Sequence, residues 1–480
     1  MVFSSLIFLT VFLPVTIILY YVIPSIRWKN CLLLVCSLFF YAWGEPKYVF
    51  LMAASIIVNY SFGLLIHRIR IRCLRRKLLL IAAVLFNLGL LVYFKYFGFL
   101  GQIVSTVLSR PLTFKEIALP IGISFFTFQG LSYVIDVYRE DPSDASTYVV
   151  QRNFLDLALY ISMFPQLIAG PIVRYHDIQP YLRGRKHSAA QFARGVELFV
   201  WGLSKKVLLA NLLGQTVDRI MVENVHMINA PIAWLGSVCY SLQLFFDFSG
   251  YSQMAIGLGK MFGFEFQENF NYPYISTSIT EFWRRWHISL SQWFRDYLYI
   301  PLGGSRKGNV YFNLFVVFLA TGLWHGAAFG FLIWGLWHGL FVLVERFLKK
   351  HTLGRFRLPK PIMWLYTMLV AVLGWTLFRL VSLRDTWNYL GILFGRNKPA
   401  FLRYGLSWYL DTRTTVVLIG AVLLCVPWLQ LLKKPFPKLD SALDSVPLTI
   451  CRRIFAVALL AVCFLFISNS TYNPFIYFRF

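Results

Sequence analysis

Long apolar runs separated by short, mostly basic segments make up almost the whole chain. The first three runs lie near Leu6–Ile23, Leu32–Trp43 and Tyr48–Ile66, and similar runs recur as far as Ile454–Ile467. A helix needs about 20 apolar residues to cross a bilayer, and only helices and closed barrels satisfy their backbone there. The pattern predicts an all-α polytopic membrane protein with roughly eleven to thirteen membrane helices, counted in a 19-residue hydropathy window.

No soluble domain is predicted between these runs. The longest polar breaks are Tyr138–Arg152, Arg174–Arg194 and Leu383–Arg413, and each is the size of a loop. No long internal repeat is apparent, which weakens an inverted-repeat transporter interpretation. We therefore expect a single transmembrane domain over residues 1–480.

Composition supports this class, and the charge pattern adds an orientation. The chain is 58% hydrophobic and 14% charged, with 46 basic against 21 acidic residues and a net charge of +25. The basic residues gather between apolar runs, in Arg68–Lys77, Arg174–Arg194, Arg346–Lys360 and Lys433–Lys438. The positive-inside rule places these loops in the cytoplasm and both termini outside, so anionic lipids rather than nucleic acid are the expected partners.

A charge-free stretch, Gly308–Val344, contains the most informative residues. Apart from Tyr311, its only titratable groups are His325 and His338, each within Leu-Trp-His-Gly. Ionisable groups at membrane depth are costly and usually functional. Apolar surroundings disfavour the charged imidazole, so a neutral His325 is suited to general-base chemistry. A purely structural hydrogen bond to a helix carbonyl is the alternative, and for His338 a helix–helix hydrogen bond is the favoured interpretation.

Glycines surround His325 at four-residue spacing. These are Gly322, Gly326 and Gly330. Glycines permit close backbone approach or a helix break beside a cavity.

The segment Glu281–Leu298 is predicted to be one amphipathic helix lying in the membrane interface. At about 100° per residue, its polar face comprises Glu281, Arg285, Gln292 and Asp296. His287 lies in the middle of the apolar face, where a structural role and a role beside His325 both remain open. Pro301 and the pair Gly303-Gly304 end the segment.

Charged residues offer two further candidate sites. Arg284 and Arg285, with Arg306 and Lys307, form a basic cluster that either contacts lipid phosphates or docks a phosphorylated or acidic acyl donor. Asp247 is a lone carboxylate in Phe-Phe-Asp-Phe-Ser-Gly-Tyr, where it could orient a histidine, hold a substrate hydroxyl, cap a helix or pair with an arginine.

Several chemistries are disfavoured by missing motifs. The chain has no G-x-x-x-x-G-K-[ST] loop, no G-x-S-x-G elbow and no H-E-x-x-H, which argues against nucleotide-driven transport, serine hydrolysis and zinc hydrolysis. Its seven cysteines include no C-x-x-C and lie mostly in apolar runs, so we expect buried thiols and no metal site.

Several long motifs resemble the membrane-bound O-acyltransferase (MBOAT) family, and within it the bacterial alginate O-acetyltransferase AlgI type. They occur in the family's order along nearly the whole chain: Phe39–Gly44, Phe164–Pro171, Phe282–Ser291, Phe294–Gly304, Gly322–Ala327 and Asn473–Phe480. One position departs from the branch, because Gln253 stands where Gly-Tyr-Ser-Asp-Met-Ala has Asp. A role for a carboxylate there is therefore in doubt.

The resemblance implies a funnel of membrane helices with re-entrant and interfacial segments, His325 at its neck and His287 as the second family histidine. It implies a multi-pass protein of the bacterial plasma membrane that moves an acyl group from a cytoplasmic thioester, acetyl-CoA or an acyl carrier protein, to a hydroxyl outside. No bound cofactor is expected. The acceptor is a cell-surface polysaccharide or an exported acetyltransferase partner of the SGNH type.

In this interpretation His325 removes the hydroxyl proton, His287 orients the acceptor or assists, and Trp324 and Trp283 shape the acyl channel. Arg284, Arg285 and Asp247 are the candidate substrate-binding residues. The alternatives are a D-alanyl transferase of the DltB type, a polysaccharide or lipid transporter with histidine proton relays, and a non-catalytic export scaffold.

Overall fold

The structure is a computed structural model that describes residues 1–69, 71, 73–109, 117–140, 150–223, 227–351, 358–399, 401–433, 435–436, 445–470 and 472–474. Every regular element in these ranges is a helix, which confirms the all-α class. Parts of the predicted basic loops, of the break at 138–152 and of the closing motif lie outside the described residues: 70, 72, 141–149, 352–357, 434, 437–438 and 475–480.

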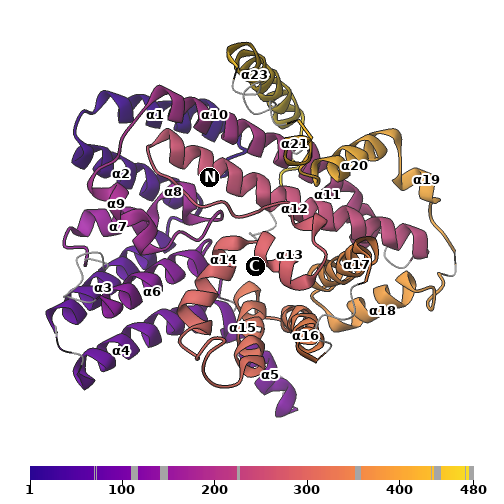
Figure 1. The fold of residues 1–480 in the computed structure, drawn as a ribbon, viewed down its shortest axis with the longest axis horizontal. Helices are drawn as coiled ribbons and strands as arrows, with labels where there is room; N and C mark the ends of the chain where they lie inside the picture. Colours follow the sequence, from indigo (N-terminus) through magenta and orange to yellow (C-terminus); the bar gives the residue numbers. More distant parts are fainter. Residues whose placement is uncertain are drawn as a thin grey trace. The chain divides into compact units, whose positions relative to one another are not determined.

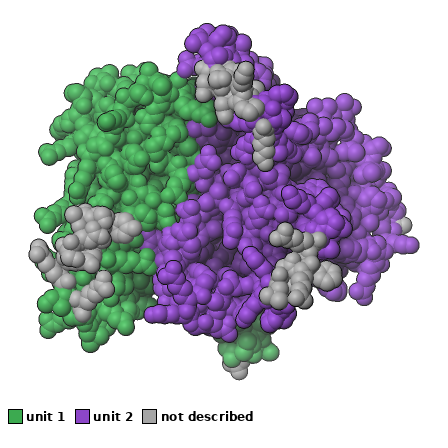
Figure 2. Space-filling model, in the orientation of Figure 1, with its two compact units in different colours: residues 1–196, 255–267 green, residues 197–254, 268–480 purple. Residues whose placement is uncertain are grey.

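The chain divides into two compact units, coloured separately in Figure 2. Unit 1 comprises Met1–Val196 with Ala255–Gln267, and unit 2 comprises Glu197–Met254 with Glu268–Phe480. The expectation of a single domain over residues 1–480 stays a prediction.

Helices long and apolar enough to cross a membrane confirm a multi-pass protein. The described residues include five of them: Tyr48–Arg68, Leu74–Val107, Phe329–His351, Lys360–Arg379 and Val446–Asn469. Three shorter apolar helices are Phe8–Val22, Val310–His325 and Thr412–Leu424. The expected count of eleven to thirteen membrane helices stays a prediction.

Unit 1 is built around helix α6 (Ile123–Arg139), which packs along α3 and α4 and buries nearly its whole length. The side-chain amides of Asn59 on α3 and Asn87 on α4 bond to each other at 2.8 and 3.2 Å, so two buried polar groups satisfy one another between membrane helices. The unit's elements are η1 Phe8–Phe12, α1 Leu13–Val22, α2 Ile26–Gly44, α3 Tyr48–Arg68, α4 Leu74–Leu91, η2 Val92–Tyr96, α5 Phe97–Val107, α6, α7 Phe154–Ser162, α8 Phe164–Leu167, α9 Tyr175–Arg183 and the start of α10 Ala189–Ser204.

Unit 2 contains the candidate site residues. Figure 1 shows α13 between α12 and the α15–α16 pair, and contacts of α13 with α16 and α17 agree with this view. Besides the end of α10, its elements are η3 Lys205–Ala210, α11 Asn211–Asp218, η4 Arg219–Glu223, most of α12 Ala230–Met261, η5 Pro273–Ile275, α13 Ile279–Arg285, α14 Ile288–Phe294, η6 Arg295–Tyr299, α15 Val310–His325, α16 Phe329–His351, α17 Lys360–Arg379, α18 Leu383–Leu393, α19 Leu406–Tyr409, α20 Thr412–Leu424, α21 Trp428–Lys433 and α23 Val446–Asn469.

Glycines let α15 and α16 pack backbone against backbone. A Cβ on Gly322 would lie 2.6 Å from the carbonyl oxygen of Phe331, and one on Gly335 would lie 2.5 Å from that of Phe318. Small residues at such contacts allow close packing where lipid supplies no hydrophobic drive between helices. The close backbone approach predicted for Gly322 is confirmed, and it fixes the end of α15, where His325 lies.

Replacing Gly335 by Leu should destabilise the protein, because the new side chain meets backbone that cannot move without separating α15 from α16. We expect a loss of about 1–3 kcal/mol or more, typical of overpacking, seen as a lower melting temperature of the detergent-solubilised protein. Gly420→Leu is the matched control, since no atom lies within 4 Å of a Cβ on that membrane-helix glycine. Equal melting temperatures for the two variants would contradict the packing described here.

Candidate functional site

The segment Glu281–Leu298 is not one helix, so that prediction was wrong. Helix α13 ends at Arg285, α14 begins at Ile288, and π-helical η6 follows. His287 breaks the run because its backbone adopts the left-handed conformation, with φ 44° and ψ 55°. This region costs energy for a residue with a Cβ, although histidine is among the side chains enriched in it. The break turns His287 away from the course of a regular amphipathic helix.

Asn269 holds the break in place from a neighbouring segment. Its backbone carbonyl accepts a hydrogen bond from the Ile288 amide at 2.9 Å. Its side-chain oxygen Oδ1 accepts from the amide of Ser289 at 3.2 Å and from the Ser289 hydroxyl at 2.9 Å, and lies 3.1 Å from His287 Nδ1. One buried asparagine therefore contacts three consecutive residues at the start of α14.

The imidazole of His287 lies in an aromatic, uncharged environment and is 1% exposed. The ring of Phe248, on α12, meets it edge-on at 4.7 Å between centroids, and the ring of Trp324 lies 6.0 Å away. Burial lowers the pKa of His287 to about 3, so the ring is neutral at physiological pH. Its Nε2 atom is buried and has no hydrogen-bond partner among the described residues.

His325 is the last residue of α15 and is 6% exposed. Three rings surround its imidazole in T-shaped contacts, those of Trp324 at 4.9 Å, Trp334 at 4.9 Å and Phe378 at 5.2 Å. The helix stops there because Gly326 is extended, and a Cβ on Gly326 would overlap the ring of Phe331 at 2.2 Å. His325 is thus held at a helix end, inside an aromatic cage.

Trp324 links the two predicted histidines, because its ring contacts both of them. Trp283, the other predicted channel residue, contacts His338 at 5.2 Å and Trp334 at 5.7 Å. Trp334 in turn contacts His325, so all of these side chains belong to one aromatic cluster of unit 2.

His338 differs from expectation. It is fully buried, and neither of its ring nitrogens has a hydrogen-bond partner in the part of the chain that the structure describes. The predicted helix–helix hydrogen bond was therefore wrong. Rings pack around the imidazole instead, and a Cβ on Gly374 of α17 would lie 2.5 Å from its Nε2 atom.

Asp247 pairs with a lysine, a partner that was not among those expected from the sequence. Its Oδ1 atom lies 2.7 Å from the ammonium of Lys206, and both side chains are 2% exposed. The same ammonium donates to the backbone carbonyl of Pro474, so it joins η3, α12 and the segment 472–474. The ion pair sits one residue before Phe248, the aromatic neighbour of His287.

The predicted basic cluster divides into two parts. Arg285 is committed to structure, because its guanidinium bonds to Glu281 at 3.0 Å and to the carbonyl of Asn271 at 3.1 Å. The side chains of Arg284, Arg306 and Lys307 are exposed. Docking of a donor at these three residues stays a prediction.

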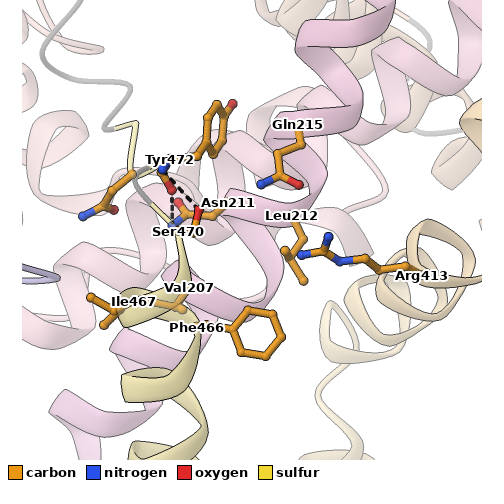
Figure 3. Close-up of a pocket in the computed structure, with 10 residues that line it drawn as sticks. Val207, Asn211, Leu212, Gln215, Arg413, Phe466, Ile467, Ser470 and Tyr472 are labelled. Carbon is orange, nitrogen blue, oxygen red and sulfur yellow. Dashed lines mark hydrogen bonds between the residues drawn. The ribbon is translucent and has the colours of Figure 1, made fainter.

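A small cavity of about 50 Å³ lies elsewhere in unit 2, against η3 and α11 (Figure 3). Arg413 and Gln215 face it from α20 and α11, and Phe466 closes its apolar side from α23. Tyr472 also lines it and donates from its hydroxyl to Asp218 at 2.6 Å. None of the predicted site residues lines this cavity.

Sequence reasoning missed Asn269, Lys206 and Trp334. Asn269 carries no motif chemistry, and only the left-handed turn at His287 reveals its role. Lys206 follows Lys205, and two consecutive lysines in sequence suggest charged groups at the membrane surface. In the structure the ammonium of Lys206 is buried. Among the described residues, no three His, Cys, Asp or Glu side chains gather as metal ligands would.

Comparison with known proteins gives a consistent assignment. The sequence profile of the membrane-bound O-acyltransferase family, MBOAT, matches residues 90–383. A probable alginate O-acetylase, AlgI, of Pseudomonas putida is 40% identical over 507 aligned positions that cover 100% of both chains. A peptidoglycan O-acetyltransferase of Helicobacter pylori is 34% identical, with 100% of this chain and 98% of that protein covered. A teichoic acid D-alanyltransferase of Bacillus subtilis is 30% identical over 43% of this chain and 54% of its own.

The buried Lys206–Asp247 ion pair predicts how substitutions at its two residues change the melting temperature. Lys206→Met removes the ammonium from a buried carboxylate, which typically costs about 3–5 kcal/mol, whereas replacing both partners by apolar residues costs far less. We expect the melting temperature of Lys206→Met to fall well below that of the double variant Lys206→Met/Asp247→Leu.

The exposed pair of Lys260 and Glu265 provides the control, because Lys260→Met should cost at most about 1 kcal/mol. A single Lys206→Met variant as stable as the double variant would show that the buried charge is not compensated by this lysine.

Proposed function

The chain belongs to the membrane-bound O-acyltransferase family, and from that membership we propose that it is an O-acetyltransferase acting on cell-surface or secreted polysaccharide. An acetyl group from a cytoplasmic thioester would reach a polysaccharide hydroxyl directly or through an exported partner of the SGNH type. The site would lie in a multi-pass protein of the bacterial plasma membrane. His325 is the proposed general base.

The observation that carries the proposal is the pair of buried imidazoles contacting one tryptophan, Trp324. Each lies among aromatic rings, and burial lowers the pKa of His287, which favours its neutral form. A neutral imidazole has one nitrogen lone pair with which to accept a proton. The two rings therefore suit acid–base chemistry on an uncharged hydroxyl.

The proposed reaction forms one bond and breaks another. The reacting hydroxyl oxygen attacks the thioester carbonyl while His325 takes its proton, giving a tetrahedral intermediate. Collapse of the intermediate breaks the carbon–sulfur bond, leaves an acetate ester and releases a thiolate, which takes the proton from His325. General-base assistance of this kind typically contributes about 10²–10⁴-fold, so positioning of donor and acceptor must supply much of the remainder.

The donor is acetyl-CoA or an acyl carrier protein, and both are anionic. The exposed guanidinium and ammonium groups of Arg284, Arg306 and Lys307 match phosphate or carboxylate groups on such donors. Trp283 and Trp324 would line the apolar route for the acetyl group. Arg285, held by Glu281, would support the surface rather than bind the donor.

An O-acetyltransferase is preferred to a D-alanyl transferase because of how much of the chain each likeness covers. The two O-acetyltransferase relatives align over 100% of this chain, and the D-alanyltransferase aligns over 43%. Alginate is a reasonable acceptor polymer to test first, since it is named in the relative from Pseudomonas putida.

The proposal predicts that His325→Ala abolishes ester-linked acetate on the host's surface or secreted polysaccharide at matched membrane expression. The physical reason is the loss of the proton acceptor for the hydroxyl, which should reduce transfer at least about 100-fold. Acetate released by mild alkali from purified polymer measures the outcome.

His351→Ala is the matched control, because this imidazole is exposed at the end of α16 and should leave acetate unchanged. Acetate unchanged in His325→Ala would overturn the role given to His325 and favour a scaffold. Failure of polymer export in His325→Ala would favour a transporter instead.

A further inference from the structure

Asn269, which holds the break between α13 and α14 in place, also determines which nitrogen of the His287 imidazole carries the proton. Asn269 is 1% exposed, and its side-chain amide nitrogen donates to the hydroxyl of Ser252 on α12 at 3.0 Å. The amide oxygen faces the opposite way, toward His287 and Ser289. Asn269 thereby bridges α12 and the start of α14.

The direction of the Asn269 amide follows from its partners. A backbone N–H can only donate, and the amide of Ser289 lies 3.2 Å from the atom assigned as Oδ1. Turning the amide over would bring its NH₂ group against that N–H, so donor would face donor. The oxygen therefore stands where it is placed, and His287 Nδ1 faces an acceptor at 3.1 Å.

That contact determines the tautomer of His287. A neutral imidazole carries its proton on one nitrogen and a lone pair on the other, and the hydrogen bond made by one nitrogen sets the state of the other. Because Nδ1 faces a carbonyl oxygen, Nδ1 carries the proton and Nε2 keeps the lone pair. Nε2 is the atom that is buried without a hydrogen-bond partner among the described residues.

We propose that Asn269 is a positioning residue that holds His287 with its Nε2 lone pair directed at the acyl acceptor, where it accepts a hydrogen bond from a sugar hydroxyl next to the reacting one. This inference rests on the proposed function. The left-handed backbone of His287, secured by the bond from Ile288 to the Asn269 carbonyl, aims the ring. Its contact with Trp324 places the ring beside the residue that precedes His325.

The contact with His287 Nε2 requires a second free hydroxyl on the acceptor. One hydroxyl would donate to His287 Nε2 while a neighbouring hydroxyl loses its proton to His325, so the acceptor should carry adjacent free hydroxyls. A sugar ring with a vicinal diol has this arrangement. An acceptor with one isolated hydroxyl would lose the contact to His287.

Two substitutions at Asn269 test the inference, with purified protein in lipid nanodiscs, acetyl-CoA as donor and alginate oligosaccharides as acceptor. Asn269→Leu removes the acceptor for Nδ1–H and should lower kcat/KM for the oligosaccharide by roughly tenfold or more, with the KM for acetyl-CoA unchanged. Asn271→Leu is the matched control, since that side chain is exposed two residues away, and it should stay within about twofold of wild type.

Asn269→Asp should change the pH dependence of the acceptor KM, which a purely structural role of Asn269 would leave unchanged. A carboxylate beside Nδ1–H favours the imidazolium and so raises the pKa of His287 from its low value. Once protonated, Nε2 donates instead of accepting, so the acceptor KM should rise as pH falls through the raised pKa. Wild type should show no such rise over the same pH range, and the KM for acetyl-CoA should not change in either protein.

Nitrogen-15 spectra of histidine-labelled protein in membranes report the tautomer without any activity, with His287 assigned by its absence in His287→Gln. We expect protonated Nδ1 and bare Nε2 in wild type, and a mixture in Asn269→Leu. Protonated Nε2 in wild type, or an Asn269→Leu enzyme with wild-type kinetics, would overturn the inference. Failure of the proposed function itself is recognised by a separate measurement: the polysaccharide would carry the same amount of acetate with and without this protein. That result would overturn the acceptor contact as well.

Discussion

The geometry of the candidate site depends on the hydrogen bonds between Asn269 and the left-handed turn at His287. Without them the run from Glu281 to Leu298 would be expected to form a regular amphipathic helix, because its polar and apolar residues alternate with helical periodicity. Left-handed backbone in a residue with a Cβ persists only where surrounding contacts determine it. Here four contacts from one asparagine do so, and they place an imidazole inside an aromatic core rather than at an interface.

A second constraint is the close crossing of α15 and α16, which depends on glycine. The crossing brings the end of α15, and with it His325, against Trp334 on α16. Larger residues at Gly322 or Gly335 would separate the helices and open the cage around the imidazole. The same small residues that allow membrane helices to pack therefore also determine how tightly water is excluded from His325.

Much of this organisation could be predicted from the sequence. The runs near Leu6–Ile23, Leu32–Trp43 and Tyr48–Ile66 correspond to α1 with η1, α2 and α3, because membrane helices have a strong hydropathy signal. His325 was a candidate because it lies in the charge-free stretch Gly308–Val344, and His287 because it lies on the apolar face of a predicted interfacial helix. The break at His287 could not be predicted, since it arises from hydrogen bonds to Asn269, eighteen residues away in sequence. The lysine partner of Asp247 could not be predicted either, because a contact between residues 41 positions apart produces no periodic pattern in the sequence.

The pairing of Asp247 with Lys206 keeps a buried carboxylate occupied close to the neutral imidazole of His287. Asp247 precedes Phe248, whose ring contacts His287, so a carboxylate free to approach that imidazole would stabilise its charged form. The ammonium of Lys206, at 2.7 Å, holds the carboxylate instead. Burial is then the cause that governs the pKa of His287, and it keeps the pKa low. Lys206 and Asp247 thus compensate each other's charge beside the aromatic cluster, and the buried imidazole of His287 stays neutral.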